Sequence, residues 1–97
     1  DVKKVELMEE NTVTREHLLI KIRVENNIRS AISEAVSVFR GKIVDYSPTS
    51  MTVEVTGETS KIDAFIELCK DFGIMEMCRA GALAIKRGES CLGNDKN

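Results

Sequence analysis

A chain of 97 residues is long enough for one domain with its own apolar core. The formal net charge is -2 and the lysines and arginines are scattered, which excludes nucleic acid and anionic membrane surfaces as expected partners. No apolar run approaches the roughly 20 residues of a transmembrane helix and no signal peptide is recognisable, so a cytoplasmic protein is expected.

The first residues read as a short strand followed by a linker. Val2, Val5 and Leu7 are apolar with charged residues between them, although the pattern does not start cleanly, and residues 9–12 are polar without periodicity. We therefore interpret residues 1–13 as the remnant of a preceding domain with its linker.

Arg15 to Glu25 has the clearest strand pattern in the sequence. One face carries Leu18, Ile20, Ile22 and Val24, while the other is polar except for Leu19. Asn26 and Asn27 then predict the N-cap of a helix, and Gly41 is expected to close that helix. Its apolar face follows helical spacing through Ile28, Ala31, Ile32, Ala35, Val36 and Phe39.

Two β-branched runs around a short polar loop predict a hairpin. The runs are Lys42 to Tyr46 and Met51 to Thr56, and the loop between them is Ser47-Pro48-Thr49-Ser50. Pro48 suits a turn because its φ is fixed and its missing N–H breaks no ladder. The buried face of the second run is expected to carry Met51, Val53 and Val55.

A second helix and a last strand follow the hairpin. Ser60 to Asp63 resembles a capping box, and Gly73 is expected to end the helix. The apolar face of that helix carries Ile62, Phe65, Ile66, Cys69 and Phe72. Ile74 to Lys86 predicts a strand, in which Gly81 could mark a bulge that changes the register. One column of this strand holds Cys78, Ala80, Ala82 and Ala84, and the other holds Met77, Arg79, Leu83 and Ile85.

The resulting order β-α-β-β-α-β predicts an α+β fold, the ferredoxin-like sandwich, over residues 14–88. Two helices would cover one face of a four-stranded antiparallel sheet, and residues 89–97 would form a flexible tail. The other face should be partly apolar through Leu19, the first hairpin strand and part of Ile74 to Ile85. Because such a patch is unusual on a monomer, we expect a homodimer or higher assembly through the open face, the sheet edges, or both.

No residue type recurs with catalytic or metal-ligating spacing, so no catalytic, cofactor-binding or metal-binding residue is assigned. His17 is the only histidine and is expected at the surface. The thiols of Cys69, Cys78 and Cys91 have no Cys-x-x-Cys spacing, which argues against a zinc site or a disulfide framework. We interpret Cys69 and Cys78 as core thiols and Cys91 as an exposed thiol of the tail.

The charged residues have simple structural interpretations. The carboxylates with solvent-facing or capping positions are Asp45, Glu54, Asp63 and Glu76. Arg79-Ala80-Gly81 and Lys86-Arg87-Gly88 do not precede a helix as a phosphate loop does, so they are interpreted as solvated strand ends.

Two other functions remain open from these residues. A ligand- or metal-sensing oligomerisation module would need His17 together with thiols of another copy. An acylphosphatase-like enzyme would need an anion site after the first strand, where Asn26, Asn27 and Arg29 lie, but Arg29 falls inside the predicted helix.

Four stretches in register resemble the regulatory (small) subunit of acetohydroxyacid synthase, also called acetolactate synthase. They are Arg15 to Ile22, Phe39 to Asp45, Gly57 with Lys61 to Phe65, and Glu76 to Gly81 followed by Arg87-Gly88. Residues 1–88 are similar to that family's C-terminal domain, with residues 1–13 resembling the end of its N-terminal ACT domain and the interdomain linker. His17 and Cys78 depart from the smaller or apolar residues that the family often has.

The resemblance implies a subunit that does no chemistry itself. Such a subunit binds the catalytic subunit, raises its activity and makes it sensitive to feedback inhibition by valine or related branched-chain amino acids, an allosteric control of their biosynthesis. The resemblance also implies that thiamine diphosphate, FAD and Mg²⁺ belong to the catalytic subunit. Because the family's effector site is attributed mainly to the ACT-domain dimer interface, no effector-binding residue is expected in this chain.

Overall fold

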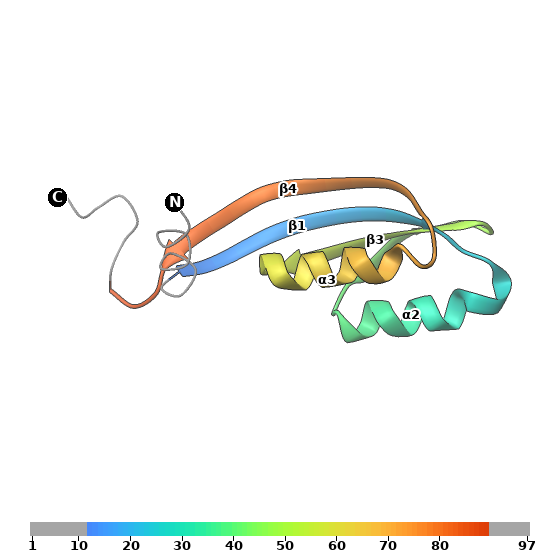
Figure 1. The fold of residues 1–97 in the computed structure, drawn as a ribbon, viewed down its shortest axis with the longest axis horizontal. Coiled ribbons are helices and arrows are strands. Elements are labelled where there is room, and N and C mark those ends of the chain that lie inside the picture. The colour runs from blue at the N-terminus through green and yellow to red at the C-terminus, as the bar shows by residue number, and fades with distance from the viewer. Residues whose placement is uncertain (1–11, 90–97) are drawn as a thin grey trace.

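The computed structural model describes residues 12–89, which form a four-stranded antiparallel sheet with two α-helices on one face (Figure 1). The elements are β1 (Thr12–Arg23), the 3-10 turn η1 (Asn26–Ile28), α2 (Arg29–Val38), β2 (Lys42–Tyr46), β3 (Ser50–Gly57), α3 (Thr59–Cys69) and β4 (Ile74–Lys86). The sheet order β2-β3-β1-β4 confirms the predicted ferredoxin-like fold. The strand expected at residues 2–7 and most of the expected tail lie outside the described residues.

The alternation of β1 decides which face of the sheet is buried. Leu18, Ile20 and Ile22 have no exposed surface, and they pair across the sheet with Val55, Val53 and Met51 of β3. Directly paired residues point to the same face, so both strands bury their apolar residues together. The predicted inward faces of β1 and β3 are thereby confirmed.

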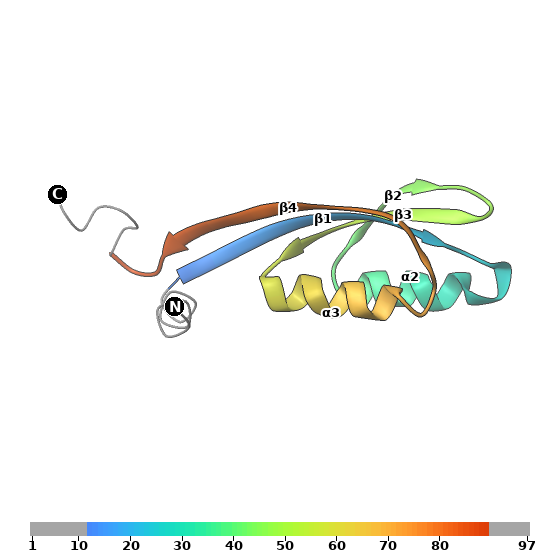
Figure 2. The same cartoon turned by 45° about the horizontal axis from the view of Figure 1, so that its top comes forward.

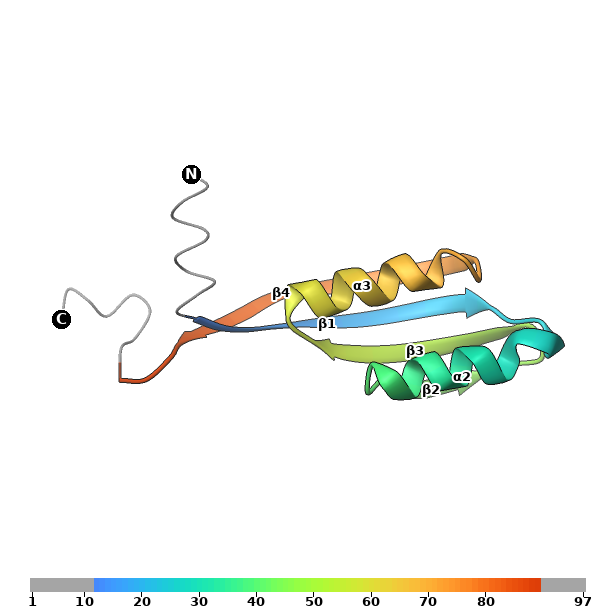
Figure 3. The same ribbon diagram turned by 60° about the horizontal axis from the view of Figure 1, so that its bottom comes forward.

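The helices cover this apolar face. Figure 3 shows α3 over β1 and β4, and α2 over β3 and β2. The ring centroids of Phe39 and Phe65 lie 5.1 Å apart in an edge-to-face contact that joins the two helices. The core contains Leu18, Ile20, Ile22, Val24, Ile32, Val36, Met51, Val53, Val55, Ile62, Phe65 and Cys69. No helix among residues 12–89 has the length and apolar content to cross a membrane.

The ends of α2 differ from the sequence prediction. Asn26 and Asn27 do not cap the helix, because they lie in the 3-10 turn η1 and α2 begins at Arg29 without a side-chain cap. The left-handed residue after α2 is Arg40, at φ 56°, and not Gly41. A Cβ on Gly41 would lie 3.1 Å from the carbonyl oxygen of Glu54, so this glycine allows the chain to approach β3 closely.

The start of α3 also differs. Glu58 precedes the helix without a side-chain cap, and Ser60 lies inside it, so the predicted capping box is wrong. Its Asp63 pairs with Arg79 of β4 instead, at 2.8 Å. The predicted end of the helix is confirmed, since Gly73 has a φ of 101° and its N–H donates to the carbonyl of Cys69.

A bulge divides β4 into two parts. His17 of β1 pairs with Ala80 and Arg15 pairs with Leu83, so β4 contains one extra residue at Gly81–Ala82. The suspected bulge is therefore present. Its consequence corrects the two predicted columns, because Leu83 and Ile85 turn to the face that carries Cys78 and Ala80.

Beyond this bulge, β1 and β4 continue past the helices as a two-stranded ribbon, which we call the arm (residues 12–16 and 83–86). Figure 2 shows the helices beneath one end of the sheet and the arm extending away from them at the other. We call the helix-covered remainder the body. Within residues 12–89, the molecule thus has one layered part and one part in which no described helix covers either face of a strand pair.

Candidate interaction surface

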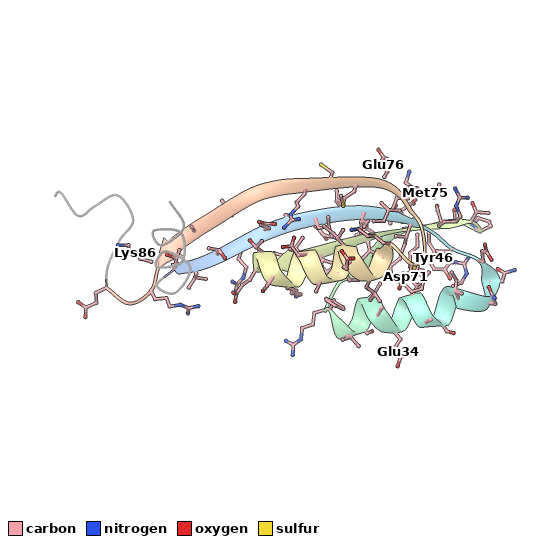
Figure 4. All side chains as sticks on the ribbon, in the orientation of Figure 1. Glu34, Tyr46, Asp71, Met75, Glu76 and Lys86 are labelled. Atoms are coloured by element: carbon pink, nitrogen blue, oxygen red, sulfur yellow. The ribbon has the colours of Figure 1, made fainter. Side chains whose placement is uncertain are left out.

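The sheet face opposite the helices, which we call the open face, gathers polar and apolar side chains from all of the described strands. Its members follow from the pairing register, because they alternate with the buried residues of each strand. They are Val13, Arg15, His17, Leu19 and Lys21 of β1, Lys42, Val44 and Asp45 of β2, Thr52, Glu54 and Thr56 of β3, and Glu76, Cys78, Ala80, Leu83 and Ile85 of β4. Figure 4 shows Glu76 projecting from β4 away from the helices, and Lys86 at the far end of the arm.

Two pairs of charged side chains cross neighbouring strands on the open face of the body. His17 Nε2 and Glu54 Oε2 are 2.5 Å apart, and Lys21 Nζ and Glu76 Oε1 are 3.2 Å apart. His17 lies at the surface as predicted. Its carboxylate partner comes from 37 residues further along the chain, because β3 pairs antiparallel with β1.

An apolar groove runs between β1 and β4 on this face. It has a volume of about 200 Å³, and Leu19 and Cys78 lie beside the Lys21–Glu76 pair along it. Cys78 is exposed, so its interpretation as a core thiol is wrong. The reason is the pairing of Cys78 with Leu19, which turns its side chain away from the helices. Cys69 is a core thiol as predicted, and burial raises its pKa to about 11.

The contribution of β2 to the open face also differs from the prediction. Ile43 pairs with Val53 and Tyr46 pairs with Met51, so both point toward the helices. An extra residue at Val44 produces this arrangement and leaves Lys42 and Asp45 on the open face. Val44 itself is 50% exposed and lies with Asp45 opposite Thr52, so it is the one apolar residue that β2 adds to the open face.

On the helix side, a network joins the body to the arm. Arg79 Nε donates to Glu16 Oε1 at 2.6 Å and its Nη2 lies 2.8 Å from Asp63 Oδ1, while the Thr59 hydroxyl donates to Glu16 Oε2 at 2.8 Å. The hydrogen bonds from Arg79 and then Thr59 hold the pKa of Glu16 below its ordinary value of 4.5. Arg79 is therefore a structural bridge between β1, β4 and α3, and the interpretation of its stretch as a solvated strand end is wrong.

Arg29, the candidate anion ligand, instead contacts the hairpin formed by β2 and β3. Its Nη2 donates to the carbonyl of Pro48 at 2.7 Å, and its guanidinium carbon lies 4.6 Å from the centroid of the Tyr46 ring. These contacts fix the loop between β2 and β3. Among residues 12–89, no three histidine, cysteine, aspartate or glutamate side chains gather as metal ligands would.

The comparisons with known proteins agree on one family. A family model described as the small subunit of acetolactate synthase matches residues 15–88. The acetolactate synthase small subunit of Mycolicibacterium smegmatis is 40% identical over 98% of this chain and 56% of its own length. The probable small subunit of Methanothermobacter thermautotrophicus is 49% identical over 79% of this chain and 46% of its own length. The chain thus spans about half the length of these curated relatives.

A solved structure supports the same conclusion. The acetolactate synthase small subunit of Thermotoga maritima superposes with a TM-score of 0.77 and 33% identity, over 93% of this chain and 67% of that one. The family match begins inside the arm at Arg15 and runs to Gly88, so it includes every helix of the body and all of β4. The chain therefore belongs to the acetolactate synthase small-subunit family and corresponds to that family's C-terminal domain.

Proposed function

We propose that this chain is a regulatory-subunit domain of an acetolactate synthase, which binds the catalytic subunit and raises its activity without doing chemistry itself. The single observation that carries the proposal is the family match over residues 15–88, together with relatives that bear the name of the small subunit. The open face, with its paired charges and its apolar groove, offers a surface for protein contact.

In this proposal the cofactors belong to the partner. Thiamine diphosphate, FAD and Mg²⁺ bind to the catalytic subunit, and the complex works in the cytoplasm. The domain supports feedback inhibition by a branched-chain amino acid such as valine, and transmits that signal rather than binding the amino acid. The effector site belongs to an ACT domain, so no residue of this chain is assigned to it.

The proposal is tested by adding the chain to the acetolactate synthase catalytic subunit of the same organism. We expect the rate of acetolactate formation to rise with chain concentration until it saturates, and the two proteins to elute together in gel filtration. A chain that carries Phe65→Asp is the control, because a charge in the core abolishes the fold and should abolish both effects. An unchanged rate without co-elution contradicts the proposal.

Adding valine distinguishes a domain that transmits the inhibitory signal from a domain that binds the effector itself. With this chain and the catalytic subunit alone, we expect the rate to be the same with and without valine. Inhibition that appears only when the chain is present would instead place an effector site within it.

A further inference from the structure

Four cations that are far apart in the sequence gather around the end of β3. Two hollows meet there, and Thr56 of β3 lines both of them. One hollow, of about 190 Å³, has Arg40 and Lys42 in its wall, and the other, of about 240 Å³, has Arg15 and Lys61. We call these four cations the basic rim. The fold thus concentrates positive charge that the sequence distributes over β1, β2, α3 and the turn before β2.

The charges of the basic rim have no anion of their own. None of the four cations forms an ion pair within residues 12–89. Arg15 donates to the carbonyl of Thr14 at 2.7 Å and Lys61 to the carbonyl of Thr56 at 3.0 Å, so neutral groups orient these two side chains. The cations that do pair with carboxylates lie elsewhere on the chain, and they are Lys21, Lys70 and Arg79. The rim therefore offers its charge to a partner.

Two carboxylates line the same hollows but do not cancel the rim. Glu54 is already paired with His17, and Glu58 is exposed in the turn before α3. The rim and these two carboxylates together carry a net charge of +2, whereas the whole chain carries -2. A local excess of one sign attracts the opposite charge even on a protein whose total charge would repel it.

A glycine at the end of β3 holds Lys61 in place. A Cβ on Gly57 would lie 2.5 Å from Cδ of Lys61, so a larger residue would displace the lysine stem. The stem lies against the backbone, and its Nζ uses one of three N–H donors on the carbonyl of Thr56. A cation that is already oriented loses little side-chain freedom when it binds an anion.

The width of the basic rim favours an extended polypeptide over a single small anion. Lys42 is level with Glu54 of β3, whereas Arg15 lies one step beyond the Glu16–Gly57 pair on the other side of that strand. Their Cα atoms are therefore two strand spacings apart across the sheet and four residue steps apart along it, about 16 Å in all. This distance is wider than one phosphate group, and about five residues of an extended chain span it.

The composition of the rim favours carboxylates over a nucleic acid. Among the described residues that line the two hollows, none is aromatic, so bases would find no surface on which to stack. The guanidinium groups of Arg15 and Arg40 can each bind a carboxylate through two parallel hydrogen bonds. An acidic peptide segment therefore matches both the charge and the length of this surface.

We propose that the basic rim binds an acidic segment of the acetolactate synthase catalytic subunit. Carboxylates of that segment lie against Arg40 and Lys42 in one hollow and against Arg15 and Lys61 in the other. This inference rests on the proposed function, which supplies the partner, and it adds the part of the surface that makes contact and the chemistry that this surface recognises.

The first test uses the chain alone with a fluorescently labelled decaglutamate peptide. We expect the anisotropy of the label to rise with chain concentration at low ionic strength, and the affinity to fall as salt is added, because salt screens exposed charges. A chain that carries Arg40→Gln and Lys61→Gln should bind the peptide roughly 2- to 30-fold more weakly, since two exposed ion pairs are lost. Because Lys61 packs on Gly57, Arg40→Gln with Lys42→Gln is a second rim variant, and it changes exposed positions alone.

The matched control carries Arg23→Gln and Lys70→Gln. These substitutions remove the same amount of charge at the opposite end of the body, where β1 and α3 end. The control should bind the peptide as tightly as the unaltered chain. The proposal is overturned if the unaltered chain does not bind the peptide, if both rim variants bind it as tightly as the control, or if a thymidine decamer binds more tightly than the peptide.

The second test identifies the source of the acidic segment. In mixtures with the catalytic subunit, we expect the rim variants to need a roughly 2- to 30-fold higher chain concentration than the unaltered chain for half of the maximal activation. The control variant should match the unaltered chain. Equal half-activation by the rim variants and the control overturns this inference and leaves the proposed function intact. Absence of activation by the unaltered chain contradicts the proposed function itself, and with it the partner named here.

Discussion

Strands β1 and β4 run through both the body and the arm, yet Leu18 in the body and Leu83 in the arm differ sharply in exposure. Leu18 in the body is fully buried, whereas Leu83 in the arm is 76% exposed. The 12 residues of β1 span about 40 Å, while the 11 residues of α3 span only about 16 Å. The helices therefore cannot cover the whole strand pair. Alternation determines the face of a side chain, and burial requires a second layer that reaches it.

The largest effect is expected where the body is best packed. Phe65 is 1% exposed and lies edge-on to Phe39, so Phe65→Ala should lower the free energy of unfolding by about 3–5 kcal/mol. Urea unfolding followed by circular dichroism measures this change. Val38→Ala, at an exposed position of α2, should change it by less than about 0.5 kcal/mol. Equal effects of the two substitutions would contradict the assigned core.

The second prediction compares a glycine of the body with a glycine of the arm's root. Gly73 has a φ of 101°, so Gly73→Ala should destabilise the fold by about 1–2 kcal/mol. Gly81 has no left-handed φ and a Cβ there meets no atom within 4 Å, so Gly81→Ala should be neutral or stabilise by about 0.4–1 kcal/mol. Thermal unfolding of the two variants checks the order. A greater loss from Gly81→Ala would show that the bulge itself needs glycine.

The third prediction concerns the network between body and arm. The pKa of Glu16 is held below 4.5 in the folded chain, mainly by Arg79, and returns to its ordinary value on unfolding. The resulting stabilisation is fully present above the unfolded pKa and is lost as the pH falls through the folded pKa. We therefore expect the free energy of unfolding to fall more steeply between about pH 6 and about pH 3 in the unaltered chain than in Glu16→Gln.

The control for this experiment is Glu67→Gln. Glu67 pairs with Lys70 at 3.0 Å on the exposed side of α3, and such pairs contribute little. The variant should keep the pH dependence of the unaltered chain. If Glu16→Gln keeps it as well, the network does not stabilise the junction.

The smallest effect is expected in the arm. Leu83→Ala should change the free energy of unfolding by less than about 0.5 kcal/mol, because Leu83 is 76% exposed and is not a member of the core. Urea unfolding of the variant and of the unaltered chain gives the difference. A loss of more than about 1 kcal/mol would mean that part of the same chain covers the arm.

The order of elements and the core were predictable because they depend on local periodicity. Leu18, Ile20 and Ile22 alternate, and Phe65 and Cys69 recur at helical spacing, so each pattern determines its own buried side. Helix ends were less predictable. Asn26 and Asp63 are residues that commonly cap helices. In the structure, however, Asn26 lies in a 3-10 turn and Asp63 forms an ion pair with Arg79.

The candidate surface was only partly predictable because it depends on register between distant strands. Leu19 identified the open face as the apolar exception on the polar side of β1. Glu54 could not be assigned to His17 from the sequence, since their contact follows from strands that pair across 37 residues. The exposure of Cys78 and the orientation of Ile43 depend on how the edge strands β4 and β2 pair with their neighbours. The spacing of apolar residues within one strand does not reveal that pairing.

The bulge at Gly81–Ala82 decides which face of the arm carries its large apolar side chains. Regular alternation from Ala80 would bring Leu83 and Ile85 to the helix side, whereas the bulge sets Gly81 and Ala82 together against Glu16 and returns both side chains to the open face. Deleting Ala82 would remove the bulge and leave Leu83 opposite Arg15, so both side chains would stay on the open face. A one-residue deletion at this point would therefore change the local twist of the arm and not the face that it presents.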